Sequence, residues 1–437
     1  MAGGYLLFKQ KQQLWSSPLC HPIAIGFLQG QIISEHLFNC IQIRVLVYNK
    51  FSMKRSHKIV LLLFFFFTFP HFYISTFAQD SSRIRISLLT CTPGDDLYAI
   101  FGHSALRVID SNSVTDIVYN YGTFNFNDEG FYLKFIRGKL LYSLSIESFN
   151  DFKFDYQISN RGITEQVLNF SAAEKTVLQH ALIENLKEEN RYYKYDFFLD
   201  NCTTRLRDLT VKNKYPHPVL PAVMPAHYRF RQAIHQYLNA GKQYWGKLGI
   251  DILLGAPTDA VMTVSQQQFL PDNLMKALNS SKNISIVQSS ENLYPFQKQD
   301  NSSWFTPMFF FVSLFLLYVF FSLSVNKNLL NILTGMDTAL FFITGLLGIL
   351  LIFMWVATDH TMTKNNYNLL WALPTHTGIA FFIHSTKTFV KKYFLITSVL
   401  LVLLLLSWFF LPQQMNNALI PFVMLLLFRS VSAYLKK

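Results

Sequence analysis

The chain has 437 residues, of which 51% are hydrophobic and 16% aromatic, with 43 phenylalanines. This composition excludes an ordinary soluble domain and is typical of a membrane protein. The 38 basic residues outnumber the 26 acidic ones and give a net charge of +12, as Lys and Arg in cytoplasmic loops would produce. No nucleic-acid-binding motif is visible, so no nucleic-acid partner is expected.

The N-terminal part contains a pattern typical of export. From Met53, a basic stretch is followed by an apolar run over residues 59–68 and a polar break that ends at Ala78. We interpret residues 53–78 as a cleaved signal peptide, because the apolar run is short for the alternative, a membrane anchor that stays in place. Residues 1–52 have no periodic pattern and are interpreted as a misread start or a non-native extension.

Residues 79–300 carry most of the polar sequence and predict an α+β domain. Alternating β-branched residues indicate strands, and the capping box of Ser171 and Glu174 opens a helix. The expected elements are strands over 84–89, 105–109, 116–121 and 164–170 and helices over 171–187 and 202–211.

Residues 301–437 are expected to form an all-α membrane domain of about five transmembrane helices. The five apolar segments are 305–323, 338–356, 369–383, 393–410 and 418–435. The third is short and contains Pro374 and His376. If the preceding domain is exported, Lys and Arg gather in the loops that face the cytoplasm, which agrees with five spans.

The candidate chemistry is a His/Cys couple. Cys202 follows Asp200 and Asn201, both good N-caps, so it should lie in the first turn of a helix, where the helix dipole favours the thiolate. His103 begins a strand and would be its base. The alternative is a buried free cysteine and a hydrogen-bonded histidine.

Other residues could complete this site. Asn120 is the predicted third catalytic residue, because it lies on the strand expected to pair with that of His103. Asn201 and Tyr98 could hold an oxyanion together with the backbone N–H of Cys202. Cys91 could line the site, form a disulfide with Cys202, or fill the core.

A polar loop between two apolar segments contains Asp359, His360, Asn368 and Trp371. It could bind a lipid headgroup, dock the exported domain, or simply be solvated. The spacing of Asp359, His360 and His376 is not that of a metal site, so neither a metal nor a cofactor is expected.

Several linked motifs are similar to one known family. They are LLTCTPGDDLYAIFGHSALRVID, DIVYNYGTFNF, DNCTTRLRD, LLGAPTD, FLPDNL and DHTMTKNNYNLLWALPTH. From about residue 85 to the C-terminus, the chain resembles the Lnb-type lipoprotein N-acyltransferases of Bacteroidota.

This resemblance implies a permuted papain-like (NlpC/P60-like) domain in the periplasm, followed by spans of the bacterial inner membrane. It also implies transfer of an acyl chain from a membrane phospholipid to the α-amine of the diacylglyceryl-cysteine that begins a lipoprotein. Cys202 would be the acylated nucleophile and His103 its base. The alternatives are a cysteine amidase or peptidase of the cell wall and a non-catalytic scaffold with a Cys91–Cys202 disulfide.

Overall fold

The computed structural model describes residues 83–96, 99–295 and 304–436. The N-terminal extension and signal peptide predicted from the sequence, together with Tyr98, lie outside the described residues.

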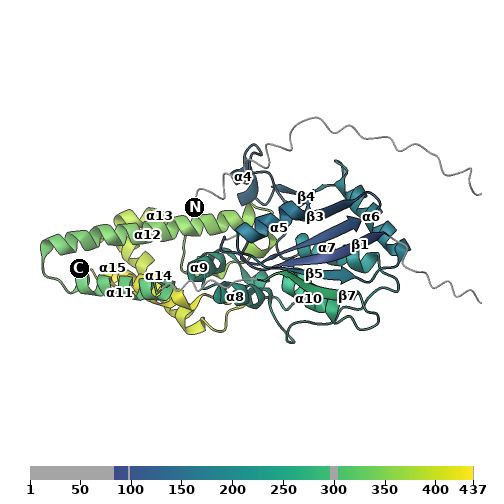
Figure 1. Ribbon diagram of the computed structural model, residues 1–437. Coiled ribbons are helices and arrows are strands. Elements are labelled where there is room, and N and C mark those ends of the chain that lie inside the picture. The colour runs from purple at the N-terminus through teal and green to yellow at the C-terminus, as the bar shows by residue number, and fades with distance from the viewer. Residues whose placement is uncertain (1–82, 97–98, 296–303, 437) are drawn as a thin grey trace, which may run out of the picture. The chain divides into compact units, whose positions relative to one another are not determined.

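A seven-stranded antiparallel sheet forms the centre of the first part of the described chain (Figure 1). Its order is β6-β4-β3-β2-β1-β5-β7. The strands are β1 (Ile84–Cys91), β2 (His103–Asp110), β3 (Thr115–Thr123), β4 (Leu141–Ser148), β5 (Ile163–Leu168), β6 (Tyr192–Lys194) and β7 (Val287–Tyr294). The four strands expected from the sequence are confirmed as β1, β2, β3 and β5.

Helices pack on both faces of this sheet. The buried apolar side chains of α6, α7 and α10 pack against one face, and those of α5 pack against the other. The helices of this part are α4 (Phe131–Ile136), α5 (Phe149–Ile158), α6 (Ala172–Leu186), α7 (Cys202–Lys212), α8 (Phe230–Ala240), α9 (Tyr244–Leu253), α10 (Pro271–Asn279) and the 3-10 turns η1 (Ala256–Asp259) and η2 (Gln266–Phe269). The predicted capping box of Ser171 and Glu174 begins α6. The predicted α+β class is therefore confirmed.

The second part of the described chain is helical and apolar. Its helices are α11 (Pro307–Ser322), α12 (Lys327–Val356), α13 (His376–Ile379), α14 (Thr388–Ser407) and α15 (Ile420–Leu435), with 3-10 turns η3 (Thr361–Thr363), η4 (Tyr367–Leu370), η5 (Ala380–Phe382) and η6 (Asn417–Leu419). Among the described residues, three helical stretches are long and apolar enough to cross a membrane: Lys327–Val356, Thr388–Ser407 and Asn417–Leu435. The apolar helix α11 is shorter.

The third expected span is not one helix. Residues 367–382 form η4, α13 and η5 instead, because Pro374 cannot donate the backbone hydrogen bond of a continuous helix. The pieces lie against α12 at two glycines. A Cβ added to Gly348 would lie 2.0 Å from the Ala372 carbonyl oxygen, and one added to Gly345 would lie 2.2 Å from the Thr377 nitrogen. Small residues therefore let the broken segment's backbone touch the long helix, as in packed membrane helices.

The polar loop after α12 attaches to the C-terminal end of α9. The side-chain amides of Asn366 and Asn368 donate to the backbone oxygens of Asp251, Ile252 and Leu253. These carbonyls belong to the last turn of the helix, where no intrahelical partner is available. Of the roles predicted for this loop, the structure supports docking of the domain.

Candidate active site

Cys202 is the first residue of α7. The Asn201 side chain accepts a hydrogen bond from the Thr204 backbone at 2.8 Å, and the Thr204 hydroxyl accepts one from the Asn201 backbone at 2.8 Å. This reciprocal cap fixes where the helix begins. The sulfur of Cys202 therefore lies in the field of the helix N-terminus, as predicted from the sequence.

His103 is the first residue of β2, directly after Gly102. Gly102 has φ +78°, and a Cβ at this position would lie 2.6 Å from the carbonyl oxygen of Cys91. Only glycine fits both the backbone conformation and the close approach. The Phe-Gly-His sequence therefore turns the chain sharply and places the His103 imidazole at the end of the sheet.

Three adjacent strands carry a hydrogen-bonded series that ends at this imidazole. His103 Nε2 lies 3.0 Å from Asn120 Oδ1, and Asn120 Nδ2 donates to Glu147 Oε1 at 2.7 Å. Because a carboxylate only accepts, Glu147 fixes the Asn120 amide with its oxygen toward the ring. His103 must then donate from Nε2, and Nδ1 is left as the basic nitrogen for Cys202.

The His103 and Cys202 side chains influence each other's ionisation. Burial opposes ionisation of Cys202, but the His103 charge, a hydrogen bond with His103 and the Ser104 backbone N–H together lower the pKa of the thiol to about 7. Burial likewise lowers the pKa of His103, but the charge of Cys202 and hydrogen bonds with Cys202 and Asn120 raise it overall. The pair is therefore suited to a thiolate beside an imidazolium near neutral pH.

Cys91 is a buried thiol on β1, the strand next to that of His103. Its backbone pairs with His103 across β1 and β2, and both Cys91 and Cys202 are free. Burial raises the pKa of Cys91 to about 12, although Arg161 and a hydrogen bond from Tyr156 oppose that shift. The disulfide of the scaffold alternative is therefore absent between these two described cysteines, and Cys91 is a poor nucleophile.

The remaining predicted residues are structural in this fold. Asn201 donates both amide hydrogens, to the carbonyls of Phe197 and Phe269, each at 2.8 Å. The proposed oxyanion role for Asn201 therefore does not fit, because its side chain has no donor left. Trp371 Nε1 donates to Asn368 Oδ1 at 2.9 Å, which orients the amide that caps α9.

Asp359 and His360 attach the loop to a different part of the domain. Lys194 donates to Asp359 at 3.0 Å, and the Asp359 backbone N–H donates to the Arg137 carbonyl at 2.9 Å. His360 Nε2 lies 3.2 and 3.1 Å from the carbonyl oxygens of Phe135 and Ile136. These contacts, too, dock the loop.

Two features of the site were not predicted from the sequence. Glu147 lies in β4, a strand not predicted from the sequence, and stands diagonally across from Asn120. A ring lies next to the nucleophile as well: a Cβ on Gly122 would be 3.3 Å from Tyr195 Cε2 and 3.7 Å from Cys202 Cβ. The alternating polar and apolar residues of 141–148 could have indicated β4.

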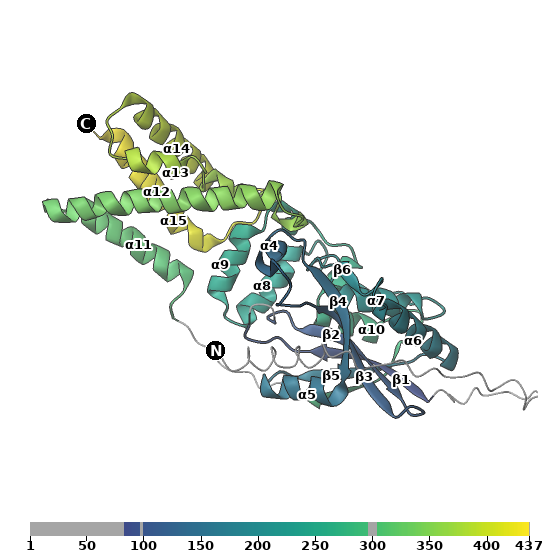
Figure 2. The same cartoon turned by 90° about the horizontal axis from the view of Figure 1, so that it is seen from above.

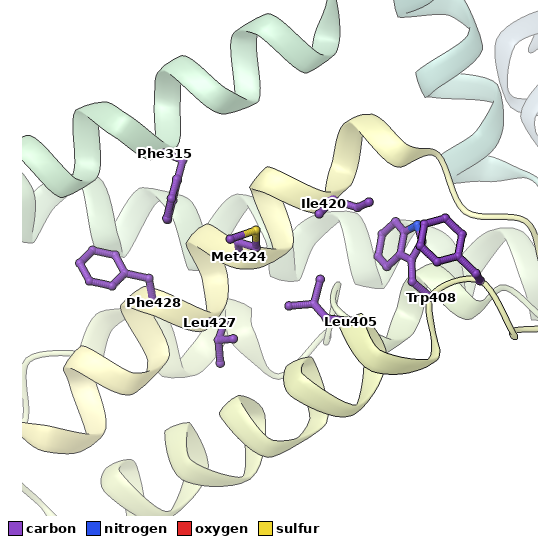
Figure 3. Close-up of a pocket in the computed structure, with 8 residues that line it drawn as sticks. Phe315, Leu405, Trp408, Ile420, Met424, Leu427 and Phe428 are labelled. Carbon is purple, nitrogen blue, oxygen red and sulfur yellow. The ribbon is translucent and has the colours of Figure 1, made fainter.

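A separate apolar cavity lies between α11, α14 and α15 (Figure 3). It has a volume of about 490 Å³ and is lined by apolar and aromatic side chains: Phe315, Leu405, Trp408, Phe409, Ile420, Met424, Leu427 and Phe428. This lining suits hydrocarbon rather than a polar group. Neither Cys202 nor His103 lines the cavity, so it is not the reaction centre.

These observations define a membrane protein whose N-terminal domain holds a Cys/His couple at the end of an antiparallel sheet. The chain belongs to the Lnb family. Residues 72–220 match the Lnb N-terminal periplasmic domain, and residues 298–437 match the Lnb transmembrane domain. Together the two matches cover about two thirds of the chain. No curated protein and no solved structure matches it.

Membership of this family gives the protein a coarse assignment. The sheet domain is the periplasmic domain of a membrane protein, and the protein acts in the processing of lipoproteins. This agrees with the resemblance found in the sequence.

Proposed function

We propose that the protein is a cysteine-dependent N-acyltransferase of the bacterial inner membrane. It would move a fatty acyl chain from a membrane phospholipid to the α-amine of the diacylglyceryl-cysteine that begins a lipoprotein. The observation that carries this proposal is the Cys202 thiol, with its pKa lowered to about 7, beside His103 in a periplasmic Lnb domain. The likeness of this arrangement to a permuted papain-like site is part of the proposal.

The first half of the reaction forms a thioester. The Cys202 thiolate attacks the ester carbonyl of the phospholipid, and the backbone N–H groups at the start of α7 stabilise the oxyanion. The C–O bond then breaks, and the leaving alkoxide takes the proton from the His103 imidazolium. The products are a lysophospholipid and acylated Cys202.

The second half transfers the chain to nitrogen. The α-amine of the lipoprotein attacks the thioester carbonyl while His103 Nδ1 accepts the amine proton. The C–S bond breaks, and the thiolate and imidazolium are restored. The net reaction converts one ester and one amine into one amide and one alcohol, so no metal or redox partner is required.

The broken third segment supports a topology with five crossings. His384, just after η5, lies 3.3 Å from the Thr334 carbonyl near the start of α12, whereas Ala372 meets Gly348 farther along. The segment therefore runs along α12 in the opposite direction. Lys387, Lys391 and Lys392 then fall on the side where α12 begins, as the positive-inside rule requires.

The decisive experiment compares lipoproteins from a strain lacking the gene that carries wild type, Cys202→Ser or Cys91→Ser. Mass spectrometry of the lipoprotein's N-terminal peptide should show three acyl chains with wild type and Cys91→Ser, and two with Cys202→Ser. Purified wild-type protein in phospholipid nanodiscs should also carry a hydroxylamine-sensitive acyl group on the Cys202 peptide. Three chains in the Cys202→Ser strain would disprove the proposal and turn attention to cell-wall peptides.

A further inference from the structure

The short helix α4 exposes an unusual amount of apolar surface. Tyr132, Leu133, Phe135 and Ile136 are 73%, 60%, 51% and 43% exposed, while Phe131 is buried. Four neighbouring apolar side chains of this size form a patch of the kind that marks an interaction site.

This patch lies next to the end of α12, a helix long and apolar enough to cross a membrane. The backbone carbonyls of Phe135, Ile136 and Arg137 bond to Asp359 and His360, which follow α12 by three and four residues. Figures 1 and 2 both show α4 near this end of α12. α12 is long and apolar enough to cross a bilayer, and a crossing by α12 would place α4 close to the level of one membrane surface.

The charges around the patch suit a phospholipid surface. Arg137 and Lys139 follow α4 directly, and Lys134 on the helix itself pairs with Asp128 at 2.7 Å. An apolar face bordered by basic residues binds the interface of a membrane, because the side chains enter the acyl region and the cations meet phosphate groups. A water-soluble protein partner would not require this position beside α12.

A row of aromatic rings leads inward from α4. The Phe131 and Phe124 rings are stacked at 5.8 Å, Phe124 meets Tyr142 at 5.1 Å, and Tyr142 stacks on Tyr195 at 4.4 Å. Phe124, Tyr142 and Tyr195 are all partly exposed.

The last ring of this row is adjacent to the nucleophile. Tyr195 and Cys202 both border the space in front of Gly122, where an added Cβ would lie within 3.7 Å of each. Glycine is required here, because its φ is +88° and an added Cβ would lie only 3.3 Å from the Tyr195 ring. The row therefore connects the exposed patch to the reacting sulfur.

We propose that α4 inserts its apolar face into the outer leaflet and that the ring row guides a phospholipid acyl chain to Cys202. This inference rests on the proposed acyl transfer and adds the route of the donor. The rings offer an apolar surface to the chain while the ester reaches the thiolate.

Insertion of α4 can be measured without any activity. Leu133→Cys in a full chain whose own four cysteines are replaced by serine would be spin-labelled in nanodiscs of phosphatidylethanolamine and phosphatidylglycerol. Val177→Cys, an exposed apolar position on α6, is the matched control. We expect the label at 133 to collide with oxygen and to be shielded from a water-soluble nickel complex, and the label at 177 to show the reverse. Equal nickel access at both positions, or dipolar broadening from a second copy at 133, would overturn the insertion.

The route is tested by comparing two acyl donors. In Leu133→Asp/Phe135→Asp, acylation of Cys202 by bilayer phospholipid, relative to acylation by a water-soluble short-chain thioester, should fall about tenfold. The control Val177→Asp/Ile183→Asp should keep the wild-type ratio. An unchanged ratio in the α4 variant would overturn the route, because a folding defect lowers both rates together. If wild-type protein never acylates Cys202, the proposed function fails, but the spin-label result still decides whether α4 is inserted.

Discussion

Replacing Glu147 by alanine should slow acylation of Cys202, although Glu147 does not touch the reacting atoms in this site. Its carboxylate is the acceptor that holds Asn120 Nδ2, at 2.7 Å. Without it, the Asn120 amide is free to rotate and present Nδ2 to the His103 ring. His103 would then carry its proton on Nδ1, facing Cys202, and could no longer accept one there.

The size of the effect follows from the bond that is lost. A hydrogen bond to a charged group contributes about 1.5–3 kcal/mol. Glu147 is only partly buried, so the lower end of that range applies, and about 1.5–2 kcal/mol corresponds to a rate loss of about ten- to thirtyfold. Glu147→Gln should lose less, because its amide oxygen can still accept from Asn120.

The pH dependence of alkylation distinguishes this role from a purely structural one. The bond between His103 and Asn120 raises the pKa of His103, and the charge of His103 lowers the pKa of Cys202 to about 7. Weakening that bond reduces the imidazolium population and moves the pKa of Cys202 upward. Alkylation by iodoacetamide, followed by mass spectrometry of the Cys202 peptide, should therefore have its midpoint near pH 7 in wild type and higher in Glu147→Ala.

Two comparisons make the result decisive. Glu291→Ala removes an exposed carboxylate from β7 of the same sheet and should change neither rate nor midpoint. The alkylation rates of wild type and Glu147→Ala should differ most near pH 7 and approach each other as the pH rises, because Cys202 then ionises in both. If Glu147→Ala keeps both the wild-type acylation rate and the wild-type midpoint, Glu147 does not position Asn120.

Two further predictions concern stability in detergent. Gly348→Leu should destabilise the protein by about 3 kcal/mol or more, because its Cβ would meet the Ala372 carbonyl. Gly335→Leu, on the same helix, meets nothing within 4 Å and should be neutral or stabilising. Equal melting temperatures for the two variants would refute the close contact between Gly348 and Ala372. Arg231→Leu should cost about 3–5 kcal/mol, because it leaves the buried Asp259 carboxylate without its cation and Asp251 with His235 as its remaining basic partner. Lys276→Leu, at an exposed position on α10, is the control, and equal melting temperatures would contradict the assigned ion pairs.

The sequence could predict the parts of the site that depend on local chemistry. A good N-cap before Cys202 and a glycine before His103 are short-range signals, and each corresponds to a fixed conformation in the structure. Asn120 could be predicted as the third catalytic residue, because the tight hairpin between β2 and β3 determines that these two strands pair. Glu147 could not be predicted, because the pairing of β3 with β4 follows a connection that contains α4 and gives no register in advance.

In the membrane part, the apolar segments could be predicted from the sequence but their internal structure could not. Hydropathy found every apolar segment but could not show that residues 369–383 break into short helices, because the compensating contacts come from Gly345 and Gly348 on another helix. A proline and several polar groups can be accommodated only when that distant backbone approaches closely. Likewise, Asn201 resembled an oxyanion donor until both of its amide hydrogens were found bonded to distant carbonyls.

The loop after α12 explains why one chain carries both parts. Its Asp359 and His360 bond to the end of α4, its Asn366 and Asn368 cap α9, and Thr361 donates to Asp196, six residues before Cys202. Three separate attachments fix the orientation of the sheet domain relative to α12, whereas a single attachment would only tether it. A hydrolase of soluble substrates would gain nothing from such an attachment. An enzyme whose donor and acceptor both lie in a bilayer gains a thiolate held at a constant height, so the entropy of aligning two membrane-bound substrates is reduced. The docking contacts therefore suit the proposed transfer between two membrane lipids.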